Sequence, residues 1–211
     1  MIDKKELAAL CEKHGYPLAA PALESLAAYL EILLKWNKVM NLVGPQSWQQ
    51  ITAGLVMDSF HLAGFLNALP LPQDPVCWDF GAGAGLPGIP LRMVWPQGEY
   101  IMVEAREKRA LFLQGALAAC KLAGTKVIRG RVEQFMAQTP KRADLMISRA
   151  FMPWRKVLEL VTGKLVPGAH VVCLTLEPEP EGIPAAWQVA ATRRYEPTPG
   201  VTHYFWAFRE K

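Results

Sequence analysis

The residues best placed to do chemistry form a glycine-rich run, WDFGAGAGLPGIP, at 78–90. Gly81, Gly83 and Gly85 would let the backbone turn tightly and approach a ligand closely. A helix beginning just after them would offer unpaired amide donors at its first turn. The pattern therefore predicts a nucleotide-binding loop between a strand and a helix. The alternative is a tight strand-to-helix connection that binds no ligand.

Two carboxylates near this loop bear on the identity of the ligand. Asp79 precedes the glycines, where it would attract the ammonium of a methionine moiety and repel a pyrophosphate. Glu104 lies about 20 residues on, where a carboxylate can accept hydrogen bonds from ribose hydroxyls. The glycines at 83, 85 and 88 also fit the dinucleotide fingerprint. Asp79 nevertheless favours S-adenosylmethionine over NAD as the cofactor.

The elements that would position these groups alternate along the chain from residue 76. Short apolar runs predict strands at 76–80, 100–104, 126–129, 144–148 and 170–176. Helical segments are expected at 88–95, 106–123 and 153–165. Such alternation predicts a parallel sheet with helices on both faces. The last two apolar runs, 187–195 and 203–209, have no helix between them and predict an antiparallel hairpin at the sheet edge.

The N-terminal third of the chain has a helical pattern instead. Leucines at 23, 26, 30, 33 and 34 recur at steps of three and four, which predicts one long amphipathic helix from Pro21 to Gly44-Pro45. Shorter helical pieces follow, and prolines at 70, 72 and 75 indicate a linker. We therefore expect an N-terminal helical segment at 1–70 and the α/β domain at 71–211.

Positive charge is concentrated in one part of the sequence. The whole chain of 211 residues has a net charge of +4. Residues 101–165 alone carry 13 Lys and Arg against 5 Asp and Glu, a net charge of +8. Such a concentration is typical of a surface that binds a polyanion, because neutralising phosphates releases counterions. The alternative is a set of solvated side chains on helix surfaces.

Composition and cysteine spacing exclude several classes of protein. With 51% hydrophobic and 20% charged residues, the chain should bury a large core. No apolar stretch is long enough to span a membrane, and the charged start lacks the apolar core of a signal peptide, so we expect a cytoplasmic protein. The four cysteines lie far apart, with no zinc-ligand spacing. They predict buried free thiols and no metal site.

Several motifs in order give the chain a family resemblance over roughly residues 20 to 175. They are LLKWNKVMNLV at 33–43, MDS at 57–59, DFGAGAGLPGIPL at 79–91, VEAREKRALFL at 103–113, RVEQF at 131–135 and SRA at 148–150. In these motifs the chain resembles the GidB-type (RsmG) methyltransferases, which modify a guanine at N7 in small-subunit (16S) ribosomal RNA. The joint order and spacing are more specific than any single motif.

The resemblance implies a fold, a cofactor and a set of site residues. The fold would be that of a class I S-adenosylmethionine-dependent methyltransferase, Rossmann-like, with a mostly parallel seven-stranded sheet, an antiparallel C-terminal hairpin and an N-terminal helical cap. Cofactor contacts are implied at Gly81, Leu86, Val132, Glu133 and Arg149. Arg149 would also orient the base, and Asn41 would face the substrate, although Asn41 could equally be a helix cap.

The implied partner is ribosomal RNA or the small ribosomal subunit, bound by a monomer. Lys108, Arg109 and Arg131 are the candidate RNA contacts, with a solvated helix face as the alternative for the first two. Guanine N7 carries an in-plane lone pair and no proton, so the reaction would need orientation more than a general base.

The chain also departs from the family pattern. Members usually have a histidine where this chain has Leu55, and a lysine where it has Thr175. His61, one helical turn beyond Asp58, is a weak candidate to replace that histidine. These departures leave open a methyltransferase acting on another RNA or a small molecule, and a cofactor-binding protein that has lost turnover.

Overall fold

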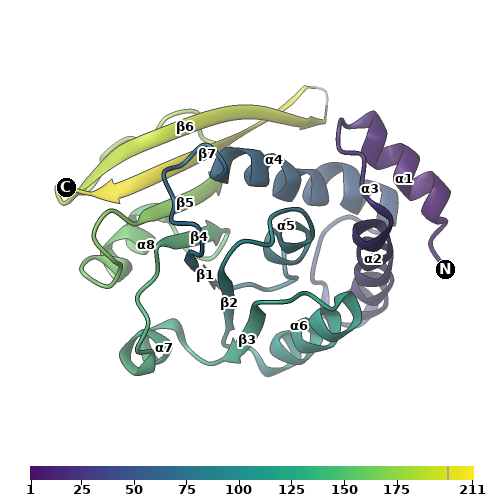
Figure 1. The fold of residues 1–211 in the computed structure, drawn as a ribbon, viewed down its shortest axis with the longest axis horizontal. Coiled ribbons are helices and arrows are strands. Elements are labelled where there is room, and N and C mark those ends of the chain that lie inside the picture. The colour runs from purple at the N-terminus through teal and green to yellow at the C-terminus, as the bar shows by residue number, and fades with distance from the viewer. Residues whose placement is uncertain (199) are drawn as a thin grey trace.

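A seven-stranded sheet forms the centre of the molecule, and a computed structural model describes it over residues 1–198 and 200–211. The strands are β1 (Val76–Phe80), β2 (Glu99–Glu104), β3 (Thr125–Arg129), β4 (Leu145–Arg149), β5 (His170–Thr175), β6 (Trp187–Thr198) and β7 (Val201–Glu210). Their order across the sheet is β3-β2-β1-β4-β5-β7-β6, as Figure 1 shows. The first five are parallel, whereas β7 runs antiparallel to both β5 and β6. The predicted Rossmann-like sheet with a C-terminal hairpin is confirmed.

Helices cover both faces of the sheet. Their bounds are α1 (Lys4–Lys13), α2 (Ala20–Met40), α3 (Trp48–Ile51), the π-helical turn η1 (Thr52–Val56), α4 (Met57–Leu66), α5 (Gly88–Val94), α6 (Glu107–Cys120), α7 (Val132–Gln138) and α8 (Trp154–Val161). One hydrophobic cluster packs α2, α4, α5 and α6 on one face, and a second packs α7 and α8 on the other. Because both faces are covered, β1 and β4 are apolar runs rather than alternating ones.

The structure corrects several expected element bounds. Helix α6 ends at Cys120 rather than at 123, because Lys121 adopts a left-handed conformation with φ 51°. Helix α8 ends at Val161, four residues earlier than expected, and Gly163 follows with φ 69°. Helix α7 was not expected, since seven residues give too short a periodic pattern to recognise.

The N-terminal helices pack directly on the sheet. Residues of α1, α2 and α4 share one buried cluster with residues of β1 and β2. The Tyr29 hydroxyl, fully buried on α2, donates a hydrogen bond of 2.7 Å to the carbonyl of Ala84 in the glycine loop. In Figure 1, α4 runs from α1 and α2 along the β6–β7 hairpin. The division at residue 70 therefore separates two segments of chain around one shared core.

Three further features are the state of the cysteines, the grouping of metal-ligating side chains and the length of the apolar helices. All four cysteines are free and buried, as predicted. Within residues 1–198 and 200–211, no cluster of three His, Cys, Asp or Glu side chains is arranged to hold a metal ion. In the same ranges, no helix combines the length and the apolar character needed to cross a bilayer.

Candidate functional site

A cleft of about 440 Å³ opens at the carboxyl ends of β1, β2 and β4. The strand order reverses between β1 and β4, and ligands of open parallel sheets bind at such a switch point. The lining residues come from the end of β2 and from the segments that follow β1, β2, β3 and β4, and are Gly81, Val103, Glu104, Ala105, Arg106, Arg109, Gly130, Arg131, Val132, Glu133, Ala150, Phe151 and Met152. The volume lies in the range of small-molecule sites.

The first two glycines of the loop differ, because Gly81 lines the cleft and Gly83 does not. Gly81 has φ 67°, and a Cβ there would lie 2.5 Å from the ring of Phe151. Gly83 has φ 55°, and a Cβ there would lie in ordinary van der Waals contact with the Gly81 carbonyl oxygen at 3.5 Å and Arg109 Nη1 at 3.8 Å. Gly81 is therefore required by a packing contact, whereas Gly83 leaves its Cα free for close approach of a ligand.

The later glycines serve the packing of α5. A Cβ on Gly85 would lie 2.5 Å from Ile89, and one on Gly88 would lie 2.6 Å from the carboxylate of Asp79. Glycine at these two positions allows α5 to lie close against the sheet. Gly85 therefore contributes to the packing of the loop against Ile89. Leu86 is half-buried against the same core and does not line the cleft.

Glu104, the last residue of β2, forms a hydrogen bond that holds the glycine loop in place. One carboxylate oxygen accepts a hydrogen bond from the Gly83 N–H at 3.0 Å, and the other accepts one from the Arg106 N–H at 2.8 Å. Each oxygen has a second lone pair that accepts no hydrogen bond from residues 1–198 or 200–211. The side chain is 5% exposed and lines the cleft, so it can accept hydrogen bonds from a diol.

The structure does not bring Asp79 to the cleft. Its carboxylate is 2% exposed, points toward Gly88 and accepts a hydrogen bond of 3.0 Å from the Tyr100 hydroxyl. Burial, together with nearby Glu104, raises the pKa of Asp79 to about 7, against the lowering effect of the Tyr100 bond. The structure therefore places this carboxylate outside the cleft lining, and its contact with the ammonium of a methionine moiety stays a prediction.

The segment after β3 supplies the far wall of the cleft. Arg131 caps the N-terminus of α7, and Val132 and Glu133 form its first turn. Val132 is 6% exposed and belongs to the core, while Glu133 is exposed at the rim. An apolar side chain beside a carboxylate acceptor suits a flat heterocycle that carries an amino group. The structure therefore brings Val132 and Glu133 together with Glu104, as the motif order implied.

Three arginines line the cleft and give its mouth a positive character. Arg106, Arg109 and Arg131 form no ion pair with any residue in the described ranges. Lys108 is exposed on the outer side of α6 and does not line the cleft. The two neighbours on α6 thus differ, since Arg109 faces the glycine loop and Lys108 faces solvent.

Arg149 ends β4 and is held by an ion pair that the motif analysis did not foresee. Its Nη2 lies 2.8 Å from Oδ2 of Asp58, whose side chain is 2% exposed. The other oxygen of Asp58 accepts hydrogen bonds from the Tyr195 hydroxyl and from Nδ1 of His203, each at 2.9 Å. MDS at 57–59 was the one available signal for Asp58. Tyr195 and His203 gave none, because pairing across a hairpin leaves no local pattern.

The remaining expected residues lie outside the cleft lining. Asn41 is exposed and forms the left-handed C-cap of α2, with φ 47°. Leu55 lies in η1, and Thr175 ends β5, where its hydroxyl accepts the Glu177 N–H at 3.1 Å. His61 pairs through Nδ1 with the Tyr16 hydroxyl at 2.8 Å, so it holds α4 to the segment after α1. The histidine that reaches Asp58 is His203.

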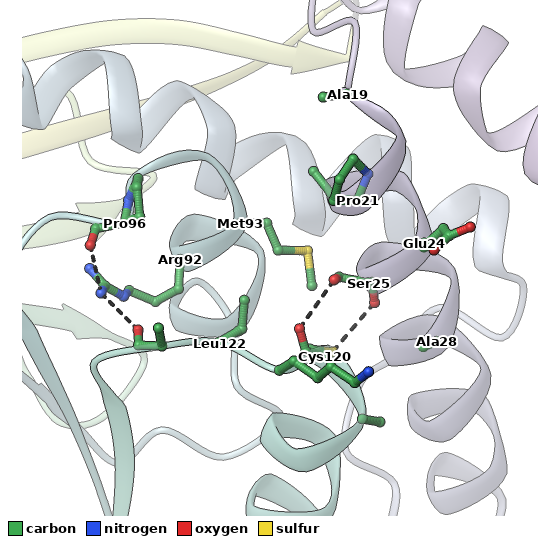
Figure 2. Close-up of a pocket in the computed structure, with 14 residues that line it drawn as sticks. Ala19, Pro21, Glu24, Ser25, Ala28, Arg92, Met93, Pro96, Cys120 and Leu122 are labelled. Carbon is green, nitrogen blue, oxygen red and sulfur yellow. Dashed lines mark hydrogen bonds between the residues drawn. The ribbon is translucent and has the colours of Figure 1, made fainter.

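A larger cavity of about 730 Å³ lies elsewhere, between α2 and the segments that precede β2 and β3. Figure 2 shows that three of its polar residues, Ser25, Cys120 and Arg92, already have partners. Ser25 and Cys120 exchange two hydrogen bonds, 3.2 and 3.4 Å long, that join α2 to the end of α6. The Arg92 guanidinium, 3% exposed, donates to five backbone carbonyls and to Thr125. We attribute this cavity to packing and the smaller cleft to ligand binding.

The cleft residues fit a ligand with a ribose, a heterocycle and an anionic group. Glu104 offers free lone pairs, Gly83 offers an open backbone, and Glu133 offers an acceptor at the rim. Arg149 Nη1 is buried without a hydrogen-bond partner in the described part of the chain. S-adenosylmethionine has all of the matching groups.

Sequence comparison finds close relatives of one kind. The family profile described as rRNA small subunit methyltransferase G (GidB) matches residues 22–193. The chain is 53% identical over 208 residues to ribosomal RNA small subunit methyltransferase G of Nitratidesulfovibrio vulgaris, covering 99% of this chain and 94% of the relative. It is 47% identical over 196 residues to the protein of that name from Lawsonia intracellularis, covering 92% and 90%.

Comparison with solved structures supports the fold. A variant of MtNAS in complex with S-adenosylmethionine superposes with a TM-score of 0.60 at 17% identity, covering 91% of this chain and 78% of that one. TrmN from Thermus thermophilus superposes with a TM-score of 0.52 at 18% identity, covering 72% and 48%. At such identities the likeness concerns the fold alone.

Proposed function

The chain belongs to the GidB family of rRNA small subunit methyltransferases, and on this premise we propose that it transfers a methyl group from S-adenosylmethionine to N7 of a guanine in small-subunit ribosomal RNA. The observation that carries the proposal is the cleft at the switch point of the sheet. There Glu104, which accepts the N–H of Gly83, and Glu133 lie on a surface that also carries three arginines.

The residues of the cleft would each hold a different part of the cofactor. Glu104 accepts from the ribose hydroxyls with the lone pairs that the protein leaves free. Gly83 allows close backbone approach, Val132 and Glu133 hold the adenine end, and Arg149 orients the carboxylate. When bound, S-adenosylmethionine supplies an electrophilic methyl group on a sulfonium.

No proton has to be removed from guanine N7, so the protein's task is orientation. The lone pair at N7 lies in the plane of the base, and holding it in line with the methyl group at about 3 Å is the main source of rate. The cleft carboxylates are engaged by backbone amides or exposed at the rim, which suits binding roles. We assign Asn41, the exposed cap of α2, to the substrate side.

The RNA would meet the basic rim of the cleft. Arg131 and Arg109 line it, and Lys108 extends the positive surface along α6. Arg106 adds a further unpaired cation, which the motif analysis did not single out. Contacts of this kind would position phosphates without reading sequence. We further propose a monomer that acts in the cytoplasm, where ribosomal RNA is found.

The test is single-turnover transfer of a labelled methyl group to purified small subunits that lack the modification. Wild-type protein should label the RNA, and Gly83→Asp should not. If the wild-type protein binds the cofactor but labels no RNA, it is a cofactor-binding protein that has lost turnover. Leu55 and Thr175, which replace the family's histidine and lysine, are consistent with that alternative. If only other RNA is labelled, the protein is a methyltransferase that acts on a different acceptor.

A further inference from the structure

The carboxylate of Asp58 gathers side chains from three distant parts of the sequence. It lies in the first turn of α4 and is buried, and its Oδ2 pairs with Arg149 Nη2 at 2.8 Å. Its Oδ1 takes both donors from the C-terminal hairpin, the Tyr195 hydroxyl on β6 and Nδ1 of His203 on β7. Every contact converges on one carboxylate, so its position is fixed from three directions.

The donors themselves are held rigidly. The Tyr195 ring stacks on Phe205 with centroids 4.3 Å apart and lies 4.8 Å from the ring of His61. Burial, and then the Asp58 charge, raise the pKa of Tyr195 well above its ordinary value, so the hydroxyl remains a donor. His203 stands edge-on to Tyr195, with ring centroids 5.6 Å apart. Neither donor can move without disturbing the packing of the hairpin.

Stability alone is a poor explanation for this arrangement. A buried ion pair contributes little net stability compared with apolar side chains of the same volume. The guanidinium is also incompletely satisfied, since Arg149 Nη1 is buried without a partner in the described ranges. An unpaired buried donor is unfavourable unless a ligand or water accepts from it. The residues that follow Arg149, Ala150 and Phe151, line the cleft.

We propose that Asp58, Tyr195 and His203 are positioning residues, which hold the Arg149 guanidinium beside the cleft in the orientation that binds the carboxylate of the cofactor's methionine moiety. Arginine matches a carboxylate better than any other side chain does, provided that the fork is held in one orientation. The C-terminal hairpin thereby acts on a site that it does not line. The inference rests on the proposed function for the identity of the cofactor.

The test is a double-mutant cycle on cofactor affinity, measured by equilibrium dialysis with labelled S-adenosylmethionine. Tyr195→Phe removes one hydroxyl and keeps the Asp58–Arg149 and Asp58–His203 contacts, so the protein should fold. It should weaken binding about 5- to 10-fold in the wild-type background. In the Arg149→Ala background the same change should alter affinity by less than about 2-fold, because nothing is left to position. Asp58→Asn should show the same dependence on Arg149.

A matched control separates positioning from damage to the hairpin. Tyr204 lies on β7, half-buried, with no hydrogen bond to its hydroxyl in the described residues, so Tyr204→Phe should leave affinity unchanged. The proposal is overturned if Tyr195→Phe leaves affinity unchanged, or weakens it equally with and without Arg149. Wild-type protein that binds the cofactor but labels no small subunits contradicts the proposed function only, and the binding cycle still decides the positioning roles.

Discussion

The carboxylate of Glu104 accepts the backbone N–H of Gly83 at 3.0 Å, which joins the end of β2 to the centre of the glycine loop. Its second oxygen accepts the N–H of Arg106, just before α6 begins. One side chain therefore sets the loop and the following helix in place before any ligand binds. Such preorganisation lowers the cost of ordering a binding site.

Replacing Glu104 should weaken cofactor binding strongly. In Glu104→Gln, only one oxygen can accept, so either Gly83 or Arg106 loses its partner and the ribose loses a charged acceptor. We expect an affinity loss of about 10- to 100-fold by calorimetry. Glu107→Gln, three residues on and paired with Arg129 at the surface, is the control and should bind normally. Equal affinities for both variants would remove Glu104 from the site.

Gly83→Asp should abolish cofactor binding and leave the fold intact. A Cβ at Gly83 would make ordinary van der Waals contacts without a clash, and aspartate tolerates a positive φ better than most residues do. The added carboxylate would occupy the ligand's path. Wild-type affinity should be micromolar, on the order of −8 kcal/mol, with no detectable binding of NADH. Gly115→Asp, on α6 in open space, is the control. Wild-type affinity in Gly83→Asp would contradict the loop's role.

The sequence was informative where local patterns determine structure. Strand-to-helix alternation predicted the sheet, and the glycine spacing predicted the loop after β1. The close contacts of Gly85 with α5 and of Gly88 with β2 arise from tertiary packing. The sequence therefore did not show that these two glycines are needed for packing. The position of Asp79 could not be predicted for a related reason. A carboxylate beside glycines is expected to contact a ligand, and only the packing around β1 shows that this one is buried. Tyr195 and His203 reach Asp58 across more than half of the chain.

The buried Asp79 should make stability depend on pH. Its pKa is raised from 3.8 to about 7, so between these values the folded protein binds more protons than the unfolded chain. The free energy of unfolding therefore falls as pH rises through this window. Asp79→Asn should raise the melting temperature by several degrees at pH 8 and by much less at pH 5. Exposed Asp74→Asn should change neither, and an equal gain for Asp79→Asn at both pH values would refute this assignment.

RNA affinity should fall steeply with salt through the basic rim. Replacing Lys108 and Arg131 together by alanine should reduce the slope of log K against log salt by about 1 to 2. The binding assay uses a ribosomal RNA fragment titrated at several salt concentrations. The control replaces Lys5 and Lys13 on α1, outside the cleft, and should leave the slope unchanged. If both pairs behave alike, Lys108 and Arg131 are only solvated side chains.

This chain should methylate guanine N7 in small-subunit ribosomal RNA. The most direct measurement is mass analysis of nucleosides from small-subunit RNA of cells with and without the gene. We predict N7-methylguanosine in the first sample, its loss in the second, and its return with the wild-type gene but not with Gly83→Asp. An identical content of N7-methylguanosine in cells with and without the gene would contradict the account.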